Sequence, residues 1–238
     1  MKSVFLSPST QEHNVGPCGY IESAEMNKVA DVAEKILTID YGIKVYRNDP
    51  KGGVGDSVRK GNSLHPDLYI AIHSNAGGAH GCEVYHNASG LPLAKLIYDG
   101  ISKLTPNLDR GIKGDGGLYE TRNAQCPAIL VETEFHDNAK GAEFIKTHID
   151  VLGGIIADSA AKVLKVSKIV IKFKSFGINT VGGRVYDVQR GLNKHGAKLT
   201  VDGQFGALTK SAVIAFQKFN KLKADGVVDI KTWTELSV

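Results

Sequence analysis

Cysteine is scarce in this chain. Its 238 residues include only three cysteines, Cys18, Cys82 and Cys126, which lie far apart in the sequence. Their odd number and the lack of a Cys-x-x-Cys pair argue against both a disulfide framework and a zinc site built from thiolates. A metal bound by this protein would therefore have to use imidazole and carboxylate groups.

Long apolar runs are also missing. No run is long enough to cross a bilayer, and the N-terminal stretch MKSVFLSPSTQEHN contains a three-residue apolar run where a signal peptide needs about seven or more. The sequence therefore predicts a soluble protein that is synthesised in the cytoplasm without a signal peptide. Its 42% hydrophobic content suffices for one ordinary domain and a small second one.

Positive charge is concentrated near the C-terminus. Residues 1–167 carry 17 Lys and Arg against 20 Asp and Glu, whereas residues 168–238 carry 12 against 5. A basic segment of this kind is typical of a module that binds an anionic polymer, such as nucleic acid or an acidic cell wall, but also of a plain solvated surface.

Strand-like runs alternate with amphipathic helix patterns over about residues 1–165. The expected strands are SVFLS, IKVYRN, DLYIAIHSNA, GCEVYHN and AILVETEF. The expected helices are AEMNKVADVAEKILTIDYG, LPLAKLIYDGISKLT, which Pro106 would end, and residues 139–164, with a Gly-rich loop before the last strand. This order predicts an α/β fold, a mostly parallel sheet with helices on both faces.

Four ionisable residues fall at one edge of that sheet. His13 follows the first strand, His73 ends LYIAIH, Glu132 ends AILVE, and Glu25 begins the first helix. Ligands bind at the carboxyl ends of the strands in such sheets, so these side chains are expected to converge. Two imidazoles and one carboxylate are a hydrolytic zinc set, and Glu132 fits the role of a general base.

Each of these residues also has a simpler interpretation. A loop histidine such as His13 is usually a surface residue, and a glutamate at a helix start is favoured by the helix dipole. His73 and Glu132 are harder to explain in this way, because an ionisable residue that ends an apolar strand is costly to bury without a partner.

Three blocks resemble a known family. SPSTQEHNVG…ESAEMN, AIHSNAGGAHGCEVY and PAILVETEFHDN are similar to the signature blocks of zinc-dependent N-acetylmuramoyl-L-alanine amidases of the amidase-3 type, a family that includes autolysins and phage endolysins. The resemblance covers about residues 1–165. It implies hydrolysis of the amide between N-acetylmuramic acid and the L-alanine of the peptidoglycan stem peptide.

The resemblance also implies roles for single residues. Zinc would be bound by His13, Glu25 and His73, and Glu132 would be the catalytic acid and base. Asn75 and Asn138 are candidates for hydrogen bonds to the peptide or for stabilising loops. Glu134, His136 and Cys18 lie near these residues in the sequence, and their contribution stays open.

A small basic module follows. Residues 164–183 alternate lysine with apolar residues, and we place a linker at residues 166–178 between domains at 1–165 and 179–238. DGQFGALT and DGVVDIKT form a repeat, in which Asp-Gly would supply a turn and Thr a helix N-cap, so that three helices pack in a bundle. About residues 175–238 resemble the type 1 peptidoglycan-binding domain.

Both resemblances point to peptidoglycan, and the missing signal peptide favours a phage or prophage endolysin that reaches the wall after release. Three alternatives remain open at this point. They are a zinc peptidase that cuts within the stem peptide, a wall-binding protein without activity, and a nucleic-acid-binding protein. The last is disfavoured because no reader motif is present.

Overall fold

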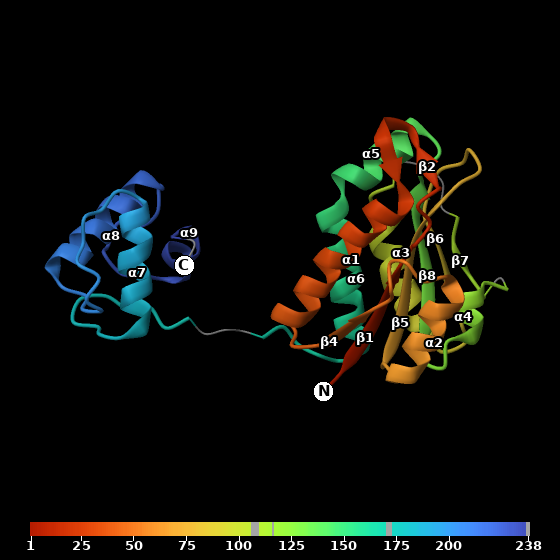
Figure 1. The fold of residues 1–238 in the computed structure, drawn as a ribbon, viewed down its shortest axis with the longest axis horizontal. Coiled ribbons are helices and arrows are strands. Elements are labelled where there is room, and N and C mark those ends of the chain that lie inside the picture. Colours follow the sequence, from red (N-terminus) through yellow and green to blue (C-terminus); the bar gives the residue numbers. More distant parts are fainter. Residues whose placement is uncertain (106–109, 116, 170–172, 237–238) are drawn as a thin grey trace. The chain divides into compact units, whose positions relative to one another are not determined.

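The computed structural model describes residues 1–105, 110–115, 117–169 and 173–236. The chain forms two compact units, Met1–Val170 and Ile171–Val238, each with its own hydrophobic core (Figure 1). Within the described ranges, no helix combines the length and apolar character that crossing a bilayer requires.

The first unit contains a six-stranded sheet in the order β4-β1-β5-β8-β6-β7. The strands are β1 (Ser3–Pro8), β4 (Lys44–Arg47), β5 (Leu68–Asn75), β6 (Glu83–His86), β7 (Ile112–Lys113) and β8 (Ala128–Phe135). Only the β6–β8 pair is antiparallel, so the prediction of a mostly parallel sheet is confirmed. A small hairpin of β2 (Val15–Gly16) and β3 (Tyr20–Ile21), joined by the 3₁₀ turn η1 (Pro17–Gly19), follows β1.

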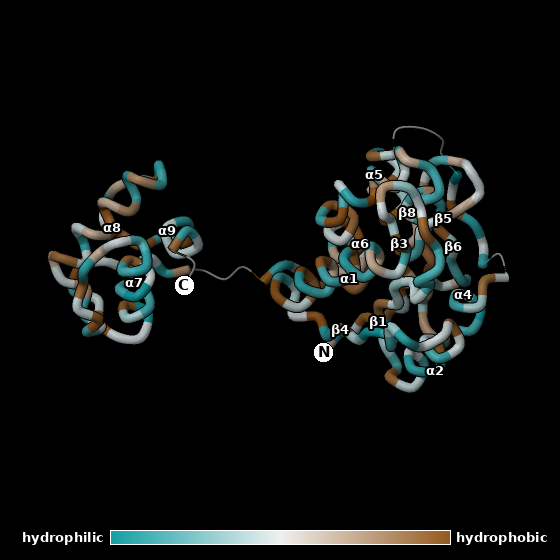
Figure 2. The backbone as a smooth tube through the Cα atoms, turned by 45° about the horizontal axis from the view of Figure 1, so that its top comes forward, coloured by the Kyte–Doolittle hydropathy of each residue, from teal (hydrophilic) through white to brown (hydrophobic). Residues whose placement is uncertain are grey.

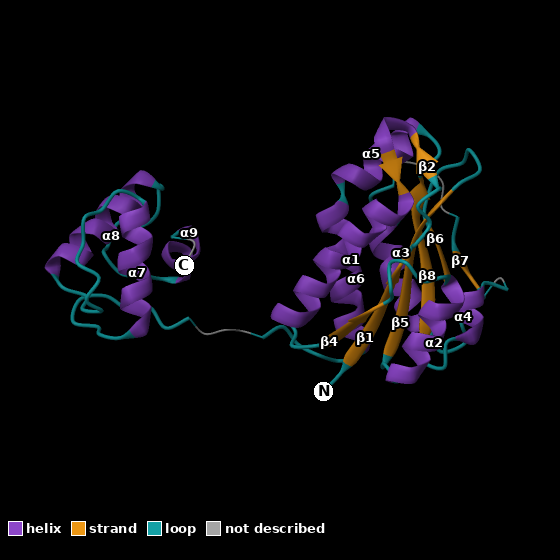
Figure 3. Cartoon of the chain, viewed as in Figure 1, coloured by secondary structure: helices purple, strands orange, loops and turns teal. Residues whose placement is uncertain are grey.

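Helices cover both faces of the sheet, as predicted (Figure 3). One face is covered by α1 (Glu22–Ile39), α3 (Leu91–Ile101) and α6 (Ile149–Val163), and the other by α2 (Val54–Leu64) and α4 (Tyr119–Asn123). The helix α5 (Ala139–Thr147) comes directly after β8. The expected end of α3 at Pro106 lies outside the described residues, and α3 itself ends at Ile101.

The two faces follow from the alternation of side chains along the strands. Ile70 and Ile72 belong to the cluster that includes α1, α3 and α6, whereas Tyr69 and Ala71 belong to the cluster on the side of α2. Figure 2 shows the apolar residues along the chain. Gly61 lets α2 approach closely, because a Cβ there would lie 2.7 Å from Cε2 of Tyr69.

The second unit is the expected bundle of α7 (Gly183–Lys194), α8 (Ala207–Phe219) and α9 (Ile230–Glu235). The expected threonine caps are wrong: Gly206 and Asp229 are the N-cap residues, and Asp229 accepts a hydrogen bond from the backbone N–H of Thr232. Thr209 and Thr232 are instead buried inside the first turn of their helices.

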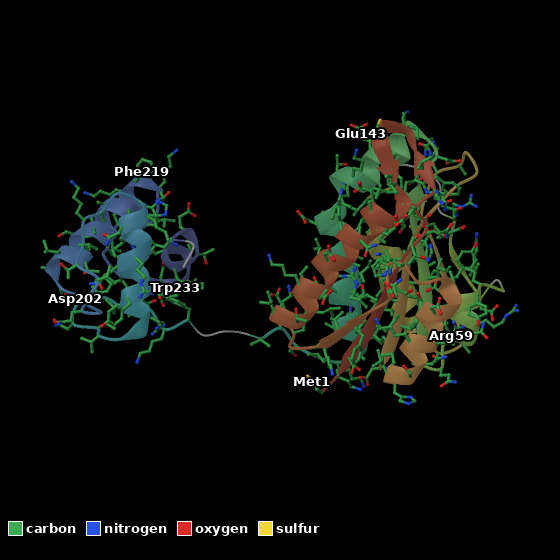
Figure 4. All side chains as sticks on the ribbon, viewed as in Figure 1. Met1, Arg59, Glu143, Asp202, Phe219 and Trp233 are labelled. Carbon is green, nitrogen blue, oxygen red and sulfur yellow. The ribbon has the colours of Figure 1, made fainter. Side chains whose placement is uncertain are left out.

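Each Asp-Gly turn of the repeat is held by a buried glutamine. Gln189 donates to Asp202, which Figure 4 labels, and to Thr209. Gln217 donates in the same way to Asp225 and Thr232. The repeat is therefore a pair of turns hydrogen-bonded to the preceding helix, which explains why Asp-Gly and Thr recur at the same spacing.

The expected linker is divided between the two units. On its N-terminal side, Val166 packs against the core of the first unit, and the N–H of Ile169 donates to the carbonyl of Asp40. On its C-terminal side, Phe173 and Phe176 pack near Trp233 in the second unit. Residues 170–172 of the expected linker lie outside the described residues.

Candidate active site

A row of ionisable residues crosses three strands near one edge of the sheet. His73 on β5 pairs in register with Glu132 on β8, and Glu132 pairs with Glu83 on β6. Residues in register on neighbouring strands project to the same face, so all three side chains lie on the side of α2 and α4. Strand pairing alone therefore places one imidazole and two carboxylates side by side, without any residue from a loop.

Two more carboxylates hold His73 from opposite sides. Its Nδ1 lies 3.1 Å from Oε1 of Glu22, at the start of α1, and its Nε2 lies 3.1 Å from Oε2 of Glu120, on α4. Oε1 of Glu120 accepts hydrogen bonds from the hydroxyls of Ser7 (2.7 Å) and Tyr69 (2.8 Å). One oxygen of Glu120 is thus held by Ser7 and Tyr69, while the other oxygen contacts the imidazole.

Glu132 has a carboxylate oxygen that is buried without a partner. Its Oε2 forms no hydrogen bond with any described residue, although the residue as a whole keeps some exposure. Burial raises the pKa of Glu132 to about 7, and the nearby carboxylates of Glu22, Glu83 and Glu120 act in the same direction, whereas His73 opposes them. A carboxyl group with such a pKa is suited to accept and return a proton near neutral pH.

The charge of the site also acts on the imidazole. Burial by itself would lower the pKa of His73, but the hydrogen bonds with Glu120 and Glu22 outweigh it and raise the pKa to about 10. The bonds with His73 in turn lower the pKa of Glu22, against the effect of its own burial. The cluster of His73 and its neighbouring carboxylates therefore has an excess of negative charge, which favours the protonated forms of His73 and Glu132.

Glu25, the expected carboxylate ligand, does not contact His73. Its two oxygens accept hydrogen bonds from Nζ of Lys28, at 2.8 and 3.0 Å. The reason is the start of the helix: α1 begins at Glu22, two residues before the expected start at Ala24. Glu22 therefore lies at the edge of the sheet, and Glu25 lies three residues further along the helix, slightly less than one turn of about 3.6 residues.

His13, the first expected histidine ligand, is exposed in the loop after β1. It lines a surface pocket of about 520 Å³ together with residues 10–14 and 50–52. The next residue, Asn14, turns inward instead, and its Nδ2 donates to Oε2 of Glu22 and to Oε1 of Gln11, both at 2.6 Å. The loop thus brings Asn14, and not His13, into contact with the cluster.

The other expected residues have defined contacts. Asn75 donates to Glu83 (2.7 Å), while Asn138 is the N-cap of α5, where its Oδ1 accepts from the N–H of Gly141 (2.8 Å). Glu134 accepts hydrogen bonds from the N–H groups of Gly81 and Phe135. A shift in register between His73 and Asn75 changes the pairing at this end of β8.

Two further residues near the site are engaged elsewhere. The Nδ1 of His136 lies 2.9 Å from the hydroxyl of Ser74, and its ring stacks on Tyr20. Cys18 is exposed in η1, and its carbonyl accepts a hydrogen bond from Lys146.

Three residues of the cluster were not expected from the sequence. Glu22 was missed because the helix start was placed too late, and Glu120 because its five-residue helix lies within a segment expected to be a loop. Glu83 carried a signal that was available: it is an ionisable residue within a strand, and the argument applied to His73 and Glu132 holds for it as well.

Two protein families match parts of this sequence. The family described as N-acetylmuramoyl-L-alanine amidase matches residues 4–161, and a family described as a putative peptidoglycan binding domain matches residues 181–236. The first match includes the whole row of ionisable residues, and the second includes all three helices of the second unit.

Individual proteins are similar to the first unit. The N-acetylmuramoyl-L-alanine amidase LytC of Bacillus subtilis is 27% identical over 159 residues, which are 61% of this chain and 32% of LytC. The N-acetylmuramoyl-L-alanine amidase CwlM of Bacillus licheniformis is 32% identical over 113 residues, 45% of this chain and 44% of CwlM. The chain thus spans a third to less than half of these relatives.

Solved structures share the fold. The catalytic domain of CwlV, an N-acetylmuramoyl-L-alanine amidase from Bacillus (Paenibacillus) polymyxa var. colistinus, superimposes with a TM-score of 0.63 at 22% identity, covering 70% of this chain and 100% of that domain. The expected phage or prophage origin is tested by none of these similarities and stays a prediction.

Proposed function

Since the chain belongs to the N-acetylmuramoyl-L-alanine amidase family, we propose that it hydrolyses the amide bond between N-acetylmuramic acid and the L-alanine of the stem peptide in bacterial peptidoglycan. The observation that carries the proposal is the buried Oε2 of Glu132, which has no hydrogen-bond partner among the described residues and lies near His73, Glu22 and Glu120. We further propose that the second unit binds the same wall, which its family match and its basic excess support.

We propose zinc as the metal of this site. Among the described residues, no group of three or more His, Cys, Asp and Glu side chains is arranged to hold a metal ion, so the proposal rests on the chemical type of the donors. Three carboxylates, Glu22, Glu120 and Glu132, lie around one imidazole, and a divalent cation would offset two of their three negative charges. Burial raises the pKa of Glu132, and the carboxylates around the site help to raise the pKa values of both Glu132 and His73; the same carboxylates would attract a cation. Imidazole and carboxylate donors are the usual ligands of catalytic zinc.

Within this set we assign separate roles. His73, through Nδ1, and Glu22 would hold the zinc, and the loop of residues 10–14 would complete its ligands through Gln11 or Asn14, since Asn14 already bonds to Glu22. Glu120 would orient the ring through Nε2, as carboxylates do for many metal-binding histidines. When bound, zinc supplies polarisation of the scissile carbonyl and a lowered pKa for water.

The protein's own proton transfer falls to Glu132. Its free Oε2 accepts a proton from the water that adds to the carbonyl carbon. The carbon–nitrogen bond then breaks, and Glu132 returns the proton to the departing amine of L-alanine. The products are a sugar chain with a free lactyl carboxyl group and a peptide with a free N-terminal amine, and Glu132 ends the cycle as it began.

The test is the loss of turbidity of purified Gram-positive peptidoglycan, with and without a chelator, followed by mass spectrometry of the products. We expect lysis that the chelator abolishes, and peptides whose new amine belongs to L-alanine. New amines within the stem peptide would indicate a peptidase instead. Binding to the wall without any cleavage would leave a wall-binding protein and refute the catalytic proposal.

The charge cluster also predicts how the stability of the metal-free protein changes with pH. The folded-state pKa is raised for Glu132, from 4.5 to about 7, and for His73, from 6.5 to about 10. The folded state therefore binds more protons than the unfolded state in these windows, and its stability falls as pH rises. We expect the melting temperature of the first unit in chelator to fall between about pH 5 and pH 9.

Two controls belong to this measurement. Glu132→Gln removes one titrating group, so the fall between about pH 5 and pH 7 should become shallower in that variant. Saturating zinc should also reduce the slope, because the cation takes the place of the protons. A melting temperature that rises with pH in chelator over this range would contradict the charge assignment.

A further inference from the structure

Glu83 continues the row of the active site and is paired with two cations. The residue is 3% exposed. Its Oε2 accepts from Nε of Arg110 at 3.0 Å and from Nζ of Lys113. Its Oε1 accepts from Nδ2 of Asn75 at 2.7 Å and from the hydroxyl of Tyr85 at 3.1 Å. Two positive charges against one negative charge leave one positive charge in excess.

This second cation exceeds what a structural role requires. A buried carboxylate needs hydrogen bonds and one opposite charge, and Lys113, Asn75 and Tyr85 already supply them to Glu83. Arg110 adds a charge next to a site that is otherwise negative. Glu83 itself therefore does not need the charge of Arg110, which is available to the carboxylates of the site or to a bound anion.

Both cations are held in place and remain accessible. The side chain of Arg110 is 34% exposed and that of Lys113 is 38% exposed. The guanidinium of Arg110 lies 4.8 Å from the centre of the Phe135 ring, and Nζ of Lys113 lies 5.3 Å from that of Tyr85. Aromatic faces of this kind fix the direction of a cation.

Arg110 has donors left for a ligand. It bonds to Glu83 through Nε, and within the described ranges its two terminal nitrogens form no hydrogen bond. These two nitrogens form the planar fork that binds a carboxylate through two parallel hydrogen bonds. A ligand carboxylate can therefore bind without breaking the contact with Glu83.

The spacing from Glu132 fits the stem peptide. Glu83 lies directly opposite Glu132 on the next strand, about 4.8 Å away, and the cations lie one hydrogen bond beyond its side chain, which places them about 8 Å from the base. A carboxylate on the second residue of the stem peptide follows the nitrogen of L-alanine by about 6 to 7 Å of extended chain. The peptide is about 1 to 2 Å shorter than the distance between the base and the cations, and a hydrogen bond of about 3 Å at each end can span the difference.

We propose that Arg110 and Lys113 bind the free carboxylate of the second stem residue, an isoglutamate whose other carboxyl group continues the peptide. The pair would thereby select walls in which this carboxylate is free over walls in which it is amidated. The inference rests on the proposed amidase function and specifies its substrate.

The experiment compares two soluble muramoyl peptides that differ only at this group, one with isoglutamate and one with isoglutamine. We expect the wild-type chain to prefer the carboxylate by about 10- to 100-fold in kcat/KM, the range of a charge-assisted bidentate contact. Arg110→Gln should reduce this preference to about threefold or less, mainly through a higher KM for the isoglutamate peptide, and the readout is the ratio of the two kcat/KM values in the same variant.

Two variants separate recognition from folding. Arg110→Lys keeps the charge and should keep an intermediate preference, because it loses only the bidentate geometry. Lys95→Gln changes the same charge at an exposed position of α3, on the opposite face of the sheet, and should keep the wild-type preference. A loss of activity toward both peptides in Arg110→Gln alone would indicate a structural role and overturn the inference.

The experiment also distinguishes the selectivity for a free carboxylate from the proposed amidase activity. Equal cleavage of both peptides by the wild-type chain would overturn the selectivity and leave the amidase proposal standing. Cleavage of neither peptide, together with intact peptidoglycan in the turbidity assay, would overturn the amidase proposal and the inference with it.

Discussion

Replacing Glu132 by glutamine is expected to lower kcat for peptidoglycan hydrolysis by about 10³-fold, within the range found when a general acid–base is lost. The amide cannot accept the proton that Oε2 takes up, although it fills nearly the same space. The fold should survive, because the change removes a charge whose burial already raises the pKa of Glu132 to about 7. Initial rates of amine release, with circular dichroism as a check on folding, measure the effect.

The matched control is Glu134→Gln, two residues further along the same strand. Glu134 accepts hydrogen bonds from the N–H groups of Gly81 and Phe135 and has a structural role in the loop before β6. We expect its loss to cost less than about tenfold in kcat, since an amide oxygen still accepts from an N–H group. A larger loss in Glu134→Gln than in Glu132→Gln would transfer the base role to Glu134.

The sheet was predictable because its strands are short apolar runs between clear breaks. Strands β5 and β8 begin with the apolar runs LYIAI and AILV, so the ionisable residue that follows each run is conspicuous. This is why His73 and Glu132 were found from the sequence. The alternation of strands and helices predicts that both residues lie at one edge of a parallel sheet, whereas the adjacency and the register of β5 and β8 are given by the structure.

The contacts of Glu120, Thr209 and Thr232 could not be predicted from hydrophobic periodicity, because their partners are distant in the sequence. Glu120 lies on a helix of five residues, which is too short for a repeating apolar pattern, and its role follows from contacts with Ser7 and Tyr69. In the second unit, the sequence predicts Thr209 and Thr232 as N-caps, because a threonine just before a helix favours that role. Their true partners, Gln189 and Gln217, lie on the preceding helix and are joined to them only by the fold.

The boundary of α1 has the largest consequence for the proposed zinc site. A helix turn is 3.6 residues, so an error of two residues in the start changes which of two glutamates, three positions apart, is proposed as a ligand. Periodicity locates the middle of a helix well and its first residue poorly, because the first turn lacks the repeat on which the pattern depends. The sequence names Glu25 for this reason, and the structure places Glu22 against His73.

Zinc content decides between these two glutamates. We expect Glu22→Gln to weaken zinc binding by at least about 100-fold, because it removes a charged donor from beside His73, and to abolish lysis with it. Glu25→Gln should keep its zinc, since Glu25 pairs with Lys28, and so should His13→Ala, since His13 is exposed. Atomic emission after dialysis against a competing chelator measures the metal independently of activity. Retention of zinc by Glu22→Gln together with its loss in Glu25→Gln and His13→Ala would restore the ligand set that the sequence alone implies.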